Sequence, residues 1–183
     1  YLLVQGAMRL KVPFGIAQIG KAFRNEIIAR NFIFRTREFE QLEMQYFVKP
    51  GSDDKIFQEW KEKRMAFYVD FLDIDKSSLR FYKHGEGDLA HYAKEACDIE
   101  YKFPFGWSEI EGVHNRTNFD LSQHEKFSGK KMSYFDQQKN ERYLPYIIET
   151  SAGLNRMLLT VLTNAYWEDK GNNRIVLKLS PKI

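Results

Sequence analysis

Charged and apolar side chains alternate through residues 23–44, FRNEIIARNFIFRTREFEQLEM, and this alternation constrains the fold more than any other part of the sequence. Side chains of a strand point alternately to its two faces, so residues four apart lie on the same face. Arg35, Phe39 and Glu43 therefore share one face of a predicted strand. The opposite face carries apolar side chains: Leu42, Met44, Tyr46 and Val48. This strand is expected to pack on one side and to present polar groups on the other.

A second predicted strand precedes this one. Residues 15–27 include Arg24 and Glu26, which are two apart and so point the same way. Joined by a loop at 28–34, the two strands form an antiparallel pair with an arginine on each. An aromatic ring between such arginines can stack a base, while the guanidinium groups bind phosphate oxygens, which is typical of a nucleotide site. Cross-strand ion pairs on a solvated sheet, each worth about 0.2–1 kcal/mol, explain the same residues equally well.

A strand followed by a helix is predicted further along the chain. Residues 143–151 have the composition of a strand, and residues 153–167 have the apolar spacing of an amphipathic helix. Ser151 is the expected N-cap. Arg156 then falls in the first turn, where free backbone N–H groups favour anions. The alternative is an amphipathic helix with an incidental arginine, and this segment by itself favours that alternative.

Two acidic residues mark another predicted strand. Glu109 and Glu111 are two apart and are expected on one face, where their carboxylates could hold Mg²⁺ against phosphates. A solvated acidic edge is the alternative interpretation. The other expected elements are a long helix beginning near Asp53, strands at 79–82, 98–103 and 174–179, helices at 88–96 and 117–126, and a hairpin around 136–140.

Composition limits the possible functions only weakly. The 183 residues can form one domain with a sizeable core, and the net charge of 28 − 25 = +3 does not by itself suggest RNA binding. Cys97 is the only cysteine, which excludes an intrachain disulfide and a cysteine-based zinc site. No apolar run approaches the ~20 residues of a membrane span, so we expect no membrane association and a cytoplasmic setting.

Two segments, in the same order along the chain, resemble sequence motifs of a known family. Arg24 and Glu26, followed by a loop and by Arg35-x-x-x-Phe39-x-x-x-Glu43, resemble motif 2 of the class II aminoacyl-tRNA synthetases. ETSAGLNR at 149–156 is similar to motif 3 of the same family. The surrounding sequence resembles that of the glycyl-tRNA synthetases of the homodimeric type. It is PFGIAQIGKAFRNEI at 13–27 and REFEQLEM at 37–44.

The resemblance implies an α+β fold, a mainly antiparallel sheet flanked by helices, with motif 2 at 23–44 and motif 3 at 143–167. It also implies that glycine and ATP react to glycyl-adenylate and pyrophosphate, and that glycine then passes to the 3′ end of tRNA(Gly). ATP is the expected nucleotide substrate, Mg²⁺ the expected cofactor, and the full-length protein is expected to be a homodimer. Because motif 1 and an anticodon-binding domain are not recognisable, residues 1–183 are expected to be a partial catalytic domain.

The family pattern assigns roles to individual residues. The expected catalytic residues are Arg24, Glu26, Arg35 and Arg156. The expected ATP-binding residues are Arg24, Asn25, Glu26, Phe34, Arg35, Thr36, Arg37, Glu38, Phe39, Glu109, Ile110, Gly153, Leu154, Asn155 and Arg156. The expected glycine-binding residues are Phe39, Glu40, Gln41, Leu42, Glu43, Glu149, Thr150, Ser151, Ala152 and Gly153. Glu109 is the expected ligand of Mg²⁺.

Two other functions fit the same fold class. One is a synthetase-like accessory protein that has lost catalysis, and the retained set of arginines argues against it. The other is a class II ligase for a different amino acid, which the extended text around motifs 2 and 3 disfavours. Choosing glycine requires shape exclusion, because the substrate has no side chain to recognise.

Overall fold

A computed structural model of the chain describes residues 1–85 and 92–183. Its α-helices are α1 (Leu2–Met8), α2 (Asp53–Ala66), α3 (Phe119–Ser128) and α4 (Leu154–Ala165). Its strands are β1 (Phe14–Phe23), β2 (Glu38–Val48), β3 (Leu79–Lys83), β4 (Glu95–Phe103), β5 (Gly106–Thr117), β6 (Tyr134–Asp136), β7 (Glu141–Tyr143), β8 (Tyr146–Gly153), β9 (Tyr166–Asp169) and β10 (Arg174–Leu177). Shorter helical turns are η1 (Phe32–Phe34), η2 (Phe67–Phe71), η3 (Lys76–Ser78) and η4 (Lys170–Asn172).

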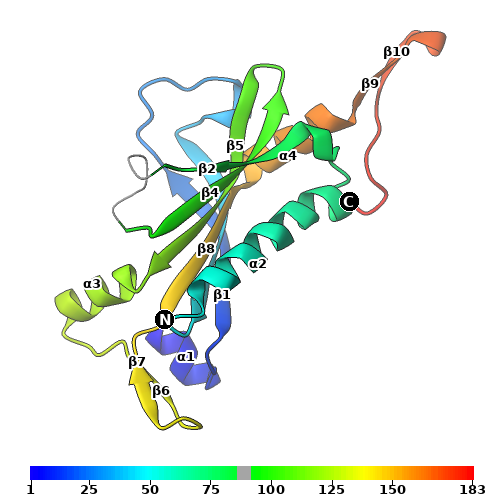
Figure 1. Ribbon diagram of the computed structural model, residues 1–183. Coiled ribbons are helices and arrows are strands. Elements are labelled where there is room, and N and C mark those ends of the chain that lie inside the picture. The colour runs from blue at the N-terminus through cyan, green and yellow to red at the C-terminus, as the bar shows by residue number, and fades with distance from the viewer. Residues whose placement is uncertain (86–91) are drawn as a thin grey trace.

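Six strands form one antiparallel sheet in the order β1-β2-β8-β5-β4-β3. The two segments that resemble motifs 2 and 3 therefore meet at the centre of the sheet, since β2 pairs directly with β8. β6 and β7 form a separate hairpin, and β9 and β10 form another that projects away from the sheet (Figure 1). The expected α+β fold with a mainly antiparallel sheet and flanking helices is confirmed.

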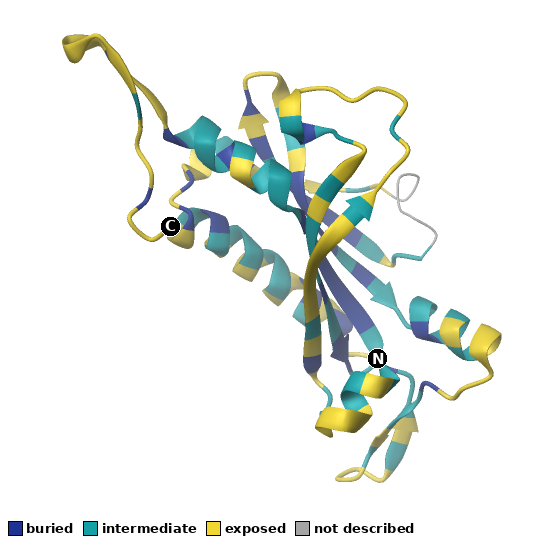
Figure 2. Ribbon diagram, turned by 180° about the vertical axis from the view of Figure 1, so that it is seen from behind, coloured by how far each residue is buried: buried dark blue, intermediate teal, exposed yellow. Residues whose placement is uncertain are grey.

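Helices α2 and α4 cover the same face of this sheet. Phe57 of α2 is fully buried in a cluster that includes Cys97 of β4. Met157 of α4 packs against a neighbouring cluster that includes Ile99, which lies two residues further along β4 and so on the same face. The buried residues concentrate along the central strands, whereas much of the edge strand β1 is exposed (Figure 2). The centre of the opposite face is left for polar groups.

Strand β5 contains two β-bulges, each of which leaves one residue of β5 unpaired. Against β4, the pairing passes from Glu111 to Glu109, so Ile110 is the extra residue. Against β8, it passes from Asn115 to Thr117, so Arg116 is the extra residue. A bulge interrupts the alternation of faces and re-aims the neighbouring side chains.

The connection between β1 and β2 is longer than the sequence predicted. β1 ends at Phe23 and β2 begins at Glu38, so Arg24 and Glu26 lie in the loop rather than on a strand. Backbone bonds close the base of this loop, with the Arg24 N–H donating to the Arg37 carbonyl at 3.0 Å. Phe34 at its far end is buried in the core, which ties the loop down onto the sheet. The strand boundaries expected at 27 and 35 were therefore wrong.

Several smaller predictions, about a helix cap and about other strands and helices, can be compared with the structure. Ser151 is not an N-cap: it lies inside β8, and Gly153 occupies the cap position without a side-chain cap bond. The helix expected at 88–96 lies partly outside the described residues, and β4 begins at Glu95. The predicted strands at 79–82 and 98–103, the helix near 117–126 and the hairpin around 136–140 are confirmed.

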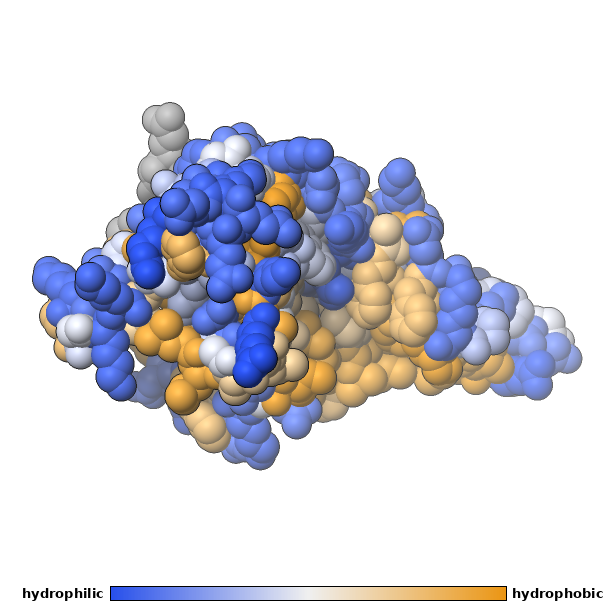
Figure 3. Space-filling view, turned by 90° about the horizontal axis from the view of Figure 1, so that it is seen from below, coloured by the Kyte–Doolittle hydropathy of each residue, from blue (hydrophilic) through white to orange (hydrophobic). Residues whose placement is uncertain are grey.

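The surface differs in polarity from one side to the other. Seen from below, hydrophilic side chains fill the upper part of the view and apolar side chains gather along its lower part (Figure 3). Exposed large apolar residues near the start of the chain include Leu3, Met8, Ile19 and Phe23. Across residues 1–85 and 92–183, no helix is long and apolar enough to cross a membrane.

Candidate functional site

Two adjoining cavities open on the sheet, where β2, β5 and β8 run side by side. The small cavity has a volume of about 60 Å³ and lies between the loop after β1, η1 and the start of α4. The large cavity, of about 620 Å³, extends along the polar face toward α3. Four residues line both cavities: Arg24, Gln41, Glu109 and Ser151. The two cavities can therefore hold two parts of one ligand or two ligands that react with each other.

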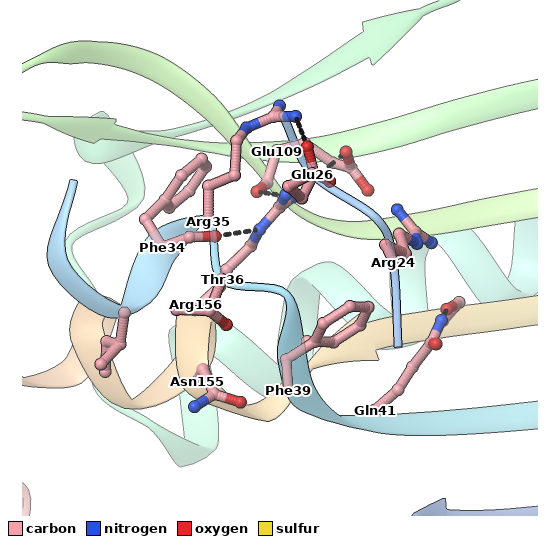
Figure 4. Close-up of a pocket in the computed structure, with 13 residues that line it drawn as sticks. Arg24, Glu26, Phe34, Arg35, Thr36, Phe39, Gln41, Glu109, Asn155 and Arg156 are labelled. Carbon is pink, nitrogen blue, oxygen red and sulfur yellow. Dashed lines mark hydrogen bonds and ion pairs between the residues drawn. The ribbon is translucent and has the colours of Figure 1, made fainter. Parts of the chain in front are cut away.

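Arg156 forms one wall of the small cavity. It stands in the first turn of α4, and its Nε donates to the Phe34 carbonyl at 3.1 Å. Its Nη1 donates to the Glu109 carbonyl at 2.9 Å and lies 3.2 Å from the Glu109 carboxylate. The guanidinium also stacks over the Phe34 ring, 4.3 Å from its centroid. Figure 4 shows this arginine held between η1 and β5.

The loop after β1 supplies the opposite wall. Arg35 Nη1 lies 3.0 Å from the Glu26 carboxylate, and Arg24 stacks over the Phe39 ring at 5.4 Å (Figure 4). Each arginine of this wall is thus held by a partner within the site, Arg35 by Glu26 and Arg24 by Phe39.

The floor of the large cavity is a hydrogen-bonded row of polar side chains. Gln45 Nε2 donates at 2.7 Å to Glu43 and at 2.7 Å to Glu149. Arg116 Nη1 lies 3.2 Å from Glu149 Oε2, the same oxygen that accepts from Gln45. Asp120 of α3 holds the same guanidinium through two bonds of 2.7 Å. The cavity thus presents two carboxylates and a fixed guanidinium on one surface.

The two carboxylates of this floor ionise differently. Burial, together with the charge of Glu149, raises the pKa of Glu43. Burial also acts to raise the pKa of Glu149, but contact with the His114 ring, the Gln45 amide and Arg116 outweighs it and the pKa lies below its ordinary value. A cation that enters between the carboxylates would favour the ionised form of both.

His114 fills the space beside Glu149. Its Nδ1 is buried, has no hydrogen-bond partner among the described residues, and lies 3.4 Å from Glu149 Oε1. The ring leans over Gly112, where an added Cβ would come within 2.6 Å of His114 Cε1 and 3.5 Å of Asp98 Oδ1. Gly112 therefore makes room for the imidazole, which narrows this side of the large cavity.

The structure brings together most of the residues that the sequence assigned to ATP. Those that line the small cavity are Arg24, Glu26, Phe34, Arg35, Thr36, Phe39, Glu109, Gly153, Asn155 and Arg156. Those that line neither cavity are Asn25, Arg37, Glu38, Ile110 and Leu154. Ile110 is buried in the core, and Arg37 instead donates to the backbone carbonyl of Glu26 at 2.9 Å.

The residues assigned to glycine divide by strand face. Those that line one or both cavities are Phe39, Gln41, Glu43, Glu149, Ser151 and Gly153. Those that line neither cavity are Glu40, Leu42, Thr150 and Ala152. The second group alternates with the first along β2 and β8, so its side chains point to the opposite face. Thr150 and Ala152 are correspondingly buried in the core.

The prediction that Glu109 and Glu111 share a face was wrong. The bulge at Ile110 turns Glu109 toward the cavities, while Glu111 is fully buried on the helix side. The Glu111 carboxylate accepts two bonds from Arg64 of α2, at 2.5 and 3.0 Å. The two carboxylates cannot hold one ion, and the described part of the chain contains no cluster of three or more acidic, histidine or cysteine side chains placed to do so.

Sequence reasoning missed two residues of β5 that line the large cavity. His114 and Arg116 both line it, and Asp120 and Gln45 hold its charged groups in place. A signal was present: His114 and Arg116 are two and four residues from Gly112, so alternation alone places all three on one face. What the sequence lacked was evidence that this face is the one that carries Glu149.

Comparison with known proteins identifies the family of this chain. Residues 3–165 match the family model described as tRNA synthetase class II core domain (G, H, P, S and T), and the chain belongs to this family. The chain is 58% identical over 182 residues to a glycine--tRNA ligase of Chlorobaculum tepidum, covering 98% of this chain and 38% of that protein.

Other relatives carry the same name. A glycine--tRNA ligase of Treponema denticola is 58% identical over 183 residues, covering 96% of this chain and 40% of the relative. A glycine--tRNA ligase of Thermobifida fusca is 51% identical over 193 residues, covering 100% and 42%. The chain thus spans about two fifths of the length of the curated relatives it matches.

Proposed function

We propose that this chain carries the active site of a glycine–tRNA ligase. It would activate glycine with ATP to glycyl-adenylate and pyrophosphate, and then transfer glycine to the 3′ end of tRNA(Gly). The observation that carries this proposal is a large cavity with paired carboxylates and a guanidinium, which adjoins a small cavity lined by arginines. The names of the relatives support the choice of glycine.

The large cavity suits the two charges of a free amino acid. The ammonium group would lie between Glu43 and Glu149, near the Ser151 hydroxyl, because two carboxylates bridged by one amide favour a cation. The carboxylate group would face Arg24 and Arg116, since guanidinium groups bind carboxylates through paired bonds. This orientation would point the reacting oxygen of glycine toward the small cavity.

The small cavity suits a nucleotide once its arginines move onto the ligand. Phe39 and Arg156 would stack on the two faces of adenine, and Arg24 would bind the α-phosphate. Arg35, released from Glu26, would bind the outer phosphates. Glu109 would supply a carboxylate to Mg²⁺, which commonly takes one or two protein carboxylates and leaves its other positions to phosphates and waters. Bound there, the ion would neutralise phosphate charge.

Activation would then proceed by in-line displacement. A glycine carboxylate oxygen forms a bond to the α-phosphorus while the bond from that phosphorus to the β-bridging oxygen breaks, and pyrophosphate leaves. In the second step the hydroxyl of the terminal ribose attacks the acyl carbon and AMP leaves. Alignment and charge stabilisation by Arg24 and the other cavity arginines would contribute more than a general base.

Selection of glycine would depend on lack of room. One methyl group in a fitted pocket changes binding by only about 1–3 kcal/mol, so the pocket wall must be close and stiff. The His114 ring, seated on Gly112 beside Glu149, is the wall that narrows the large cavity. Alanine and serine would meet this ring.

A homodimeric, cytoplasmic enzyme is part of the same proposal. The family resemblance supports both features, and the exposed apolar side chains of α1 and of the edge strand β1 agree with a buried interface in the complete protein. Motif 2 at 23–44 and motif 3 at 143–167 are the segments of the catalytic domain that we assign to this chain.

Amino-acid-dependent exchange of pyrophosphate with ATP tests this proposal. We expect exchange with glycine and none above background with alanine or serine. The Arg24→Ala variant should lose exchange while its circular dichroism spectrum stays unchanged, because Arg24 lies in an exposed loop. Exchange with another amino acid, or folded protein without exchange even when extended at both ends, would contradict the proposal and favour a binding protein that has lost catalysis.

A further inference from the structure

Helix α3 continues one wall of the large cavity outward. Asp120 and His124 of this helix line the cavity. Phe127 lies three residues beyond His124, and helix residues three or four apart share a face, so the face that lines the cavity continues onto Phe127. The side of Phe127 is open to solvent: the residue is 79% exposed, and Figure 2 shows the outer end of α3 exposed. A large apolar ring beside the cavity is therefore left without cover.

Three exposed lysines accompany this ring. Lys126 Nζ lies 5.3 Å from the centroid of the Phe127 ring, and Lys130 and Lys131 follow in the turn after the helix. Across residues 1–85 and 92–183, no carboxylate forms an ion pair with any of the three. Their positive charges are thus available to an anionic partner.

The turn that carries Lys130 and Lys131 is fixed at both ends. Gly129 ends α3 with a φ of 68°, and its N–H donates to the Glu125 carbonyl at 3.0 Å. After the two lysines, the Met132 N–H donates to the Glu125 carboxylate at 2.7 Å. The Met132 side chain is buried in a core cluster. Because the turn is held in this way, a partner that binds it orders little additional backbone.

The chemistry of this surface fits a single strand of nucleic acid. An exposed aromatic ring can stack a base of any kind, and lysines neutralise the phosphates on either side of it. The large cavity, of about 620 Å³, is in the size range that holds a drug-sized ligand, and glycine is far smaller. The cavity therefore has space for a second reactant beside the amino acid.

We propose that Lys126, Phe127, Lys130 and Lys131, the outer surface of α3, bind the single-stranded 3′ end of an RNA that enters the large cavity. Phe127 stacks one base, and the lysines bind the neighbouring phosphates. This assignment rests on the proposed function, because transfer of glycine requires the terminal ribose to reach the acyl carbon. The strand would approach along α3, from the side of the cavity opposite to the small cavity.

Fluorescence anisotropy with two labelled RNA hairpins tests the stacking contact. One hairpin has a short single-stranded 3′ end and the other is blunt. Phe127→Ala should weaken binding of the first hairpin about tenfold, and Phe127→Trp, which keeps a stacking surface, should bind it within about twofold of the unmodified chain. Binding of the blunt hairpin should change less than about twofold in both variants. Loss of both hairpins in Phe127→Ala, or of neither, would overturn the proposal.

A salt series tests the phosphate contacts. Lys130→Gln combined with Lys131→Gln should weaken binding of the hairpin with the single-stranded end, and should reduce the slope of log affinity against log salt by about 1 to 2. The matched control is Lys55→Gln combined with Lys76→Gln, which removes the same charge from exposed positions on α2 and η3. An equal effect of the two double variants would contradict the proposal. Binding of phosphatidylserine vesicles in place of RNA would contradict it as well.

Exchange of pyrophosphate with ATP separates this proposal from the proposed function. The exchange reaction needs no RNA, so Phe127→Ala and the variant of Lys130 and Lys131 should retain glycine-dependent exchange within about twofold. A chain that exchanges but binds neither hairpin would refute the RNA surface alone. A chain that binds RNA through Phe127 but never exchanges would refute the proposed function and keep the surface.

Discussion

Glu43 and Glu149 share the amide of Gln45, yet folding shifts their ionisation in opposite directions. A carboxyl whose pKa rises on folding binds protons more tightly in the folded state, so its ionisation lowers the free energy of unfolding as pH rises. A carboxyl whose pKa falls contributes stability that is present above its unfolded pKa. That stability is lost as pH falls through the folded pKa. The site therefore keeps one destabilising charge and one stabilising charge side by side.

Replacement of each carboxylate should reveal this difference. At neutral pH, Glu43→Gln is expected to raise the melting temperature and Glu149→Gln to lower it, each by about 2–4 °C for an effect near 1 kcal/mol. Both should weaken glycine binding. The two differences should shrink as the pH falls through the folded pKa of each group, which thermal melts over a pH series would check. Shifts of the same sign would contradict the assignment.

Gly112 and His114 form a second pair at the scale of single residues. A Cβ at position 112 would lie 2.6 Å from His114 Cε1, so Gly112→Ala must displace the ring from its place beside Glu149. We expect a cost of about 1–3 kcal/mol in stability and a loss of glycine affinity. The double variant with His114→Ala removes the clash and should recover most of the stability. A double-mutant cycle by denaturant unfolding measures this coupling, and additive effects would show that the two residues do not interact.

At the scale of elements, the antiparallel pairing of β1 with β2 could be predicted from the sequence. The polar alternation of β2 and the apolar face of Met44 and Val48 fixed which side packs, and the structure agrees. The loop boundaries could not be predicted, because burial of Phe34 and a backbone bond between Arg24 and Arg37 decide where the strands stop. Neither feature leaves a local signal in the sequence.

The bulges of β5 explain the other errors. One extra residue in a strand inverts the face assignment of every residue beyond it. The strand itself was predicted correctly, but the prediction that Glu111 shares a face with Glu109 was therefore wrong. The real partner of Glu111, Arg64, is 47 residues away on helix α2. Arg116 was missed because its role depends on the pairing of β5 with β8, which sequence spacing does not reveal.

Asn155 joins α4 to β2, two of the elements that line the small cavity. Its Oδ1 at the start of α4 accepts a bond of 2.9 Å from the Glu40 N–H of β2. Asn155→Ala should cost about 1 kcal/mol of stability and weaken ATP binding several-fold, because Arg156 is its neighbour. Asn164→Ala is the matched control, since Asn164 bonds the backbone of Asp73 and Asp75 from the far end of the same helix. Fluorescence titration with ATP should distinguish them, and equal loss of affinity in both would contradict this role.

At the scale of the whole molecule, one sheet face carries packing and the other carries the site. Helices α2 and α4 cover the first face and are also bonded to a strand that contributes to the site. Side chains of α2 and β5 are joined by hydrogen bonds, and Arg156 of α4 donates to the Glu109 carbonyl of β5. The fold class and most residues of the small cavity were predictable from the sequence segments that resemble motifs 2 and 3. The large cavity needed the structure, because its charged floor is assembled from β2, β5, β8 and α3.

The most direct test of the account is binding of glycyl-sulfamoyl-adenosine, an analogue of glycyl-adenylate that cannot be hydrolysed. Its glycyl and adenosine parts should occupy the large and small cavities together. Calorimetry should give one site per chain, with affinity greater than that of AMP or glycine alone. Glu149→Gln and Arg156→Ala should each weaken it. Binding no tighter than AMP, or insensitivity to Glu149→Gln, would contradict the claim that the two cavities form one site for glycyl-adenylate.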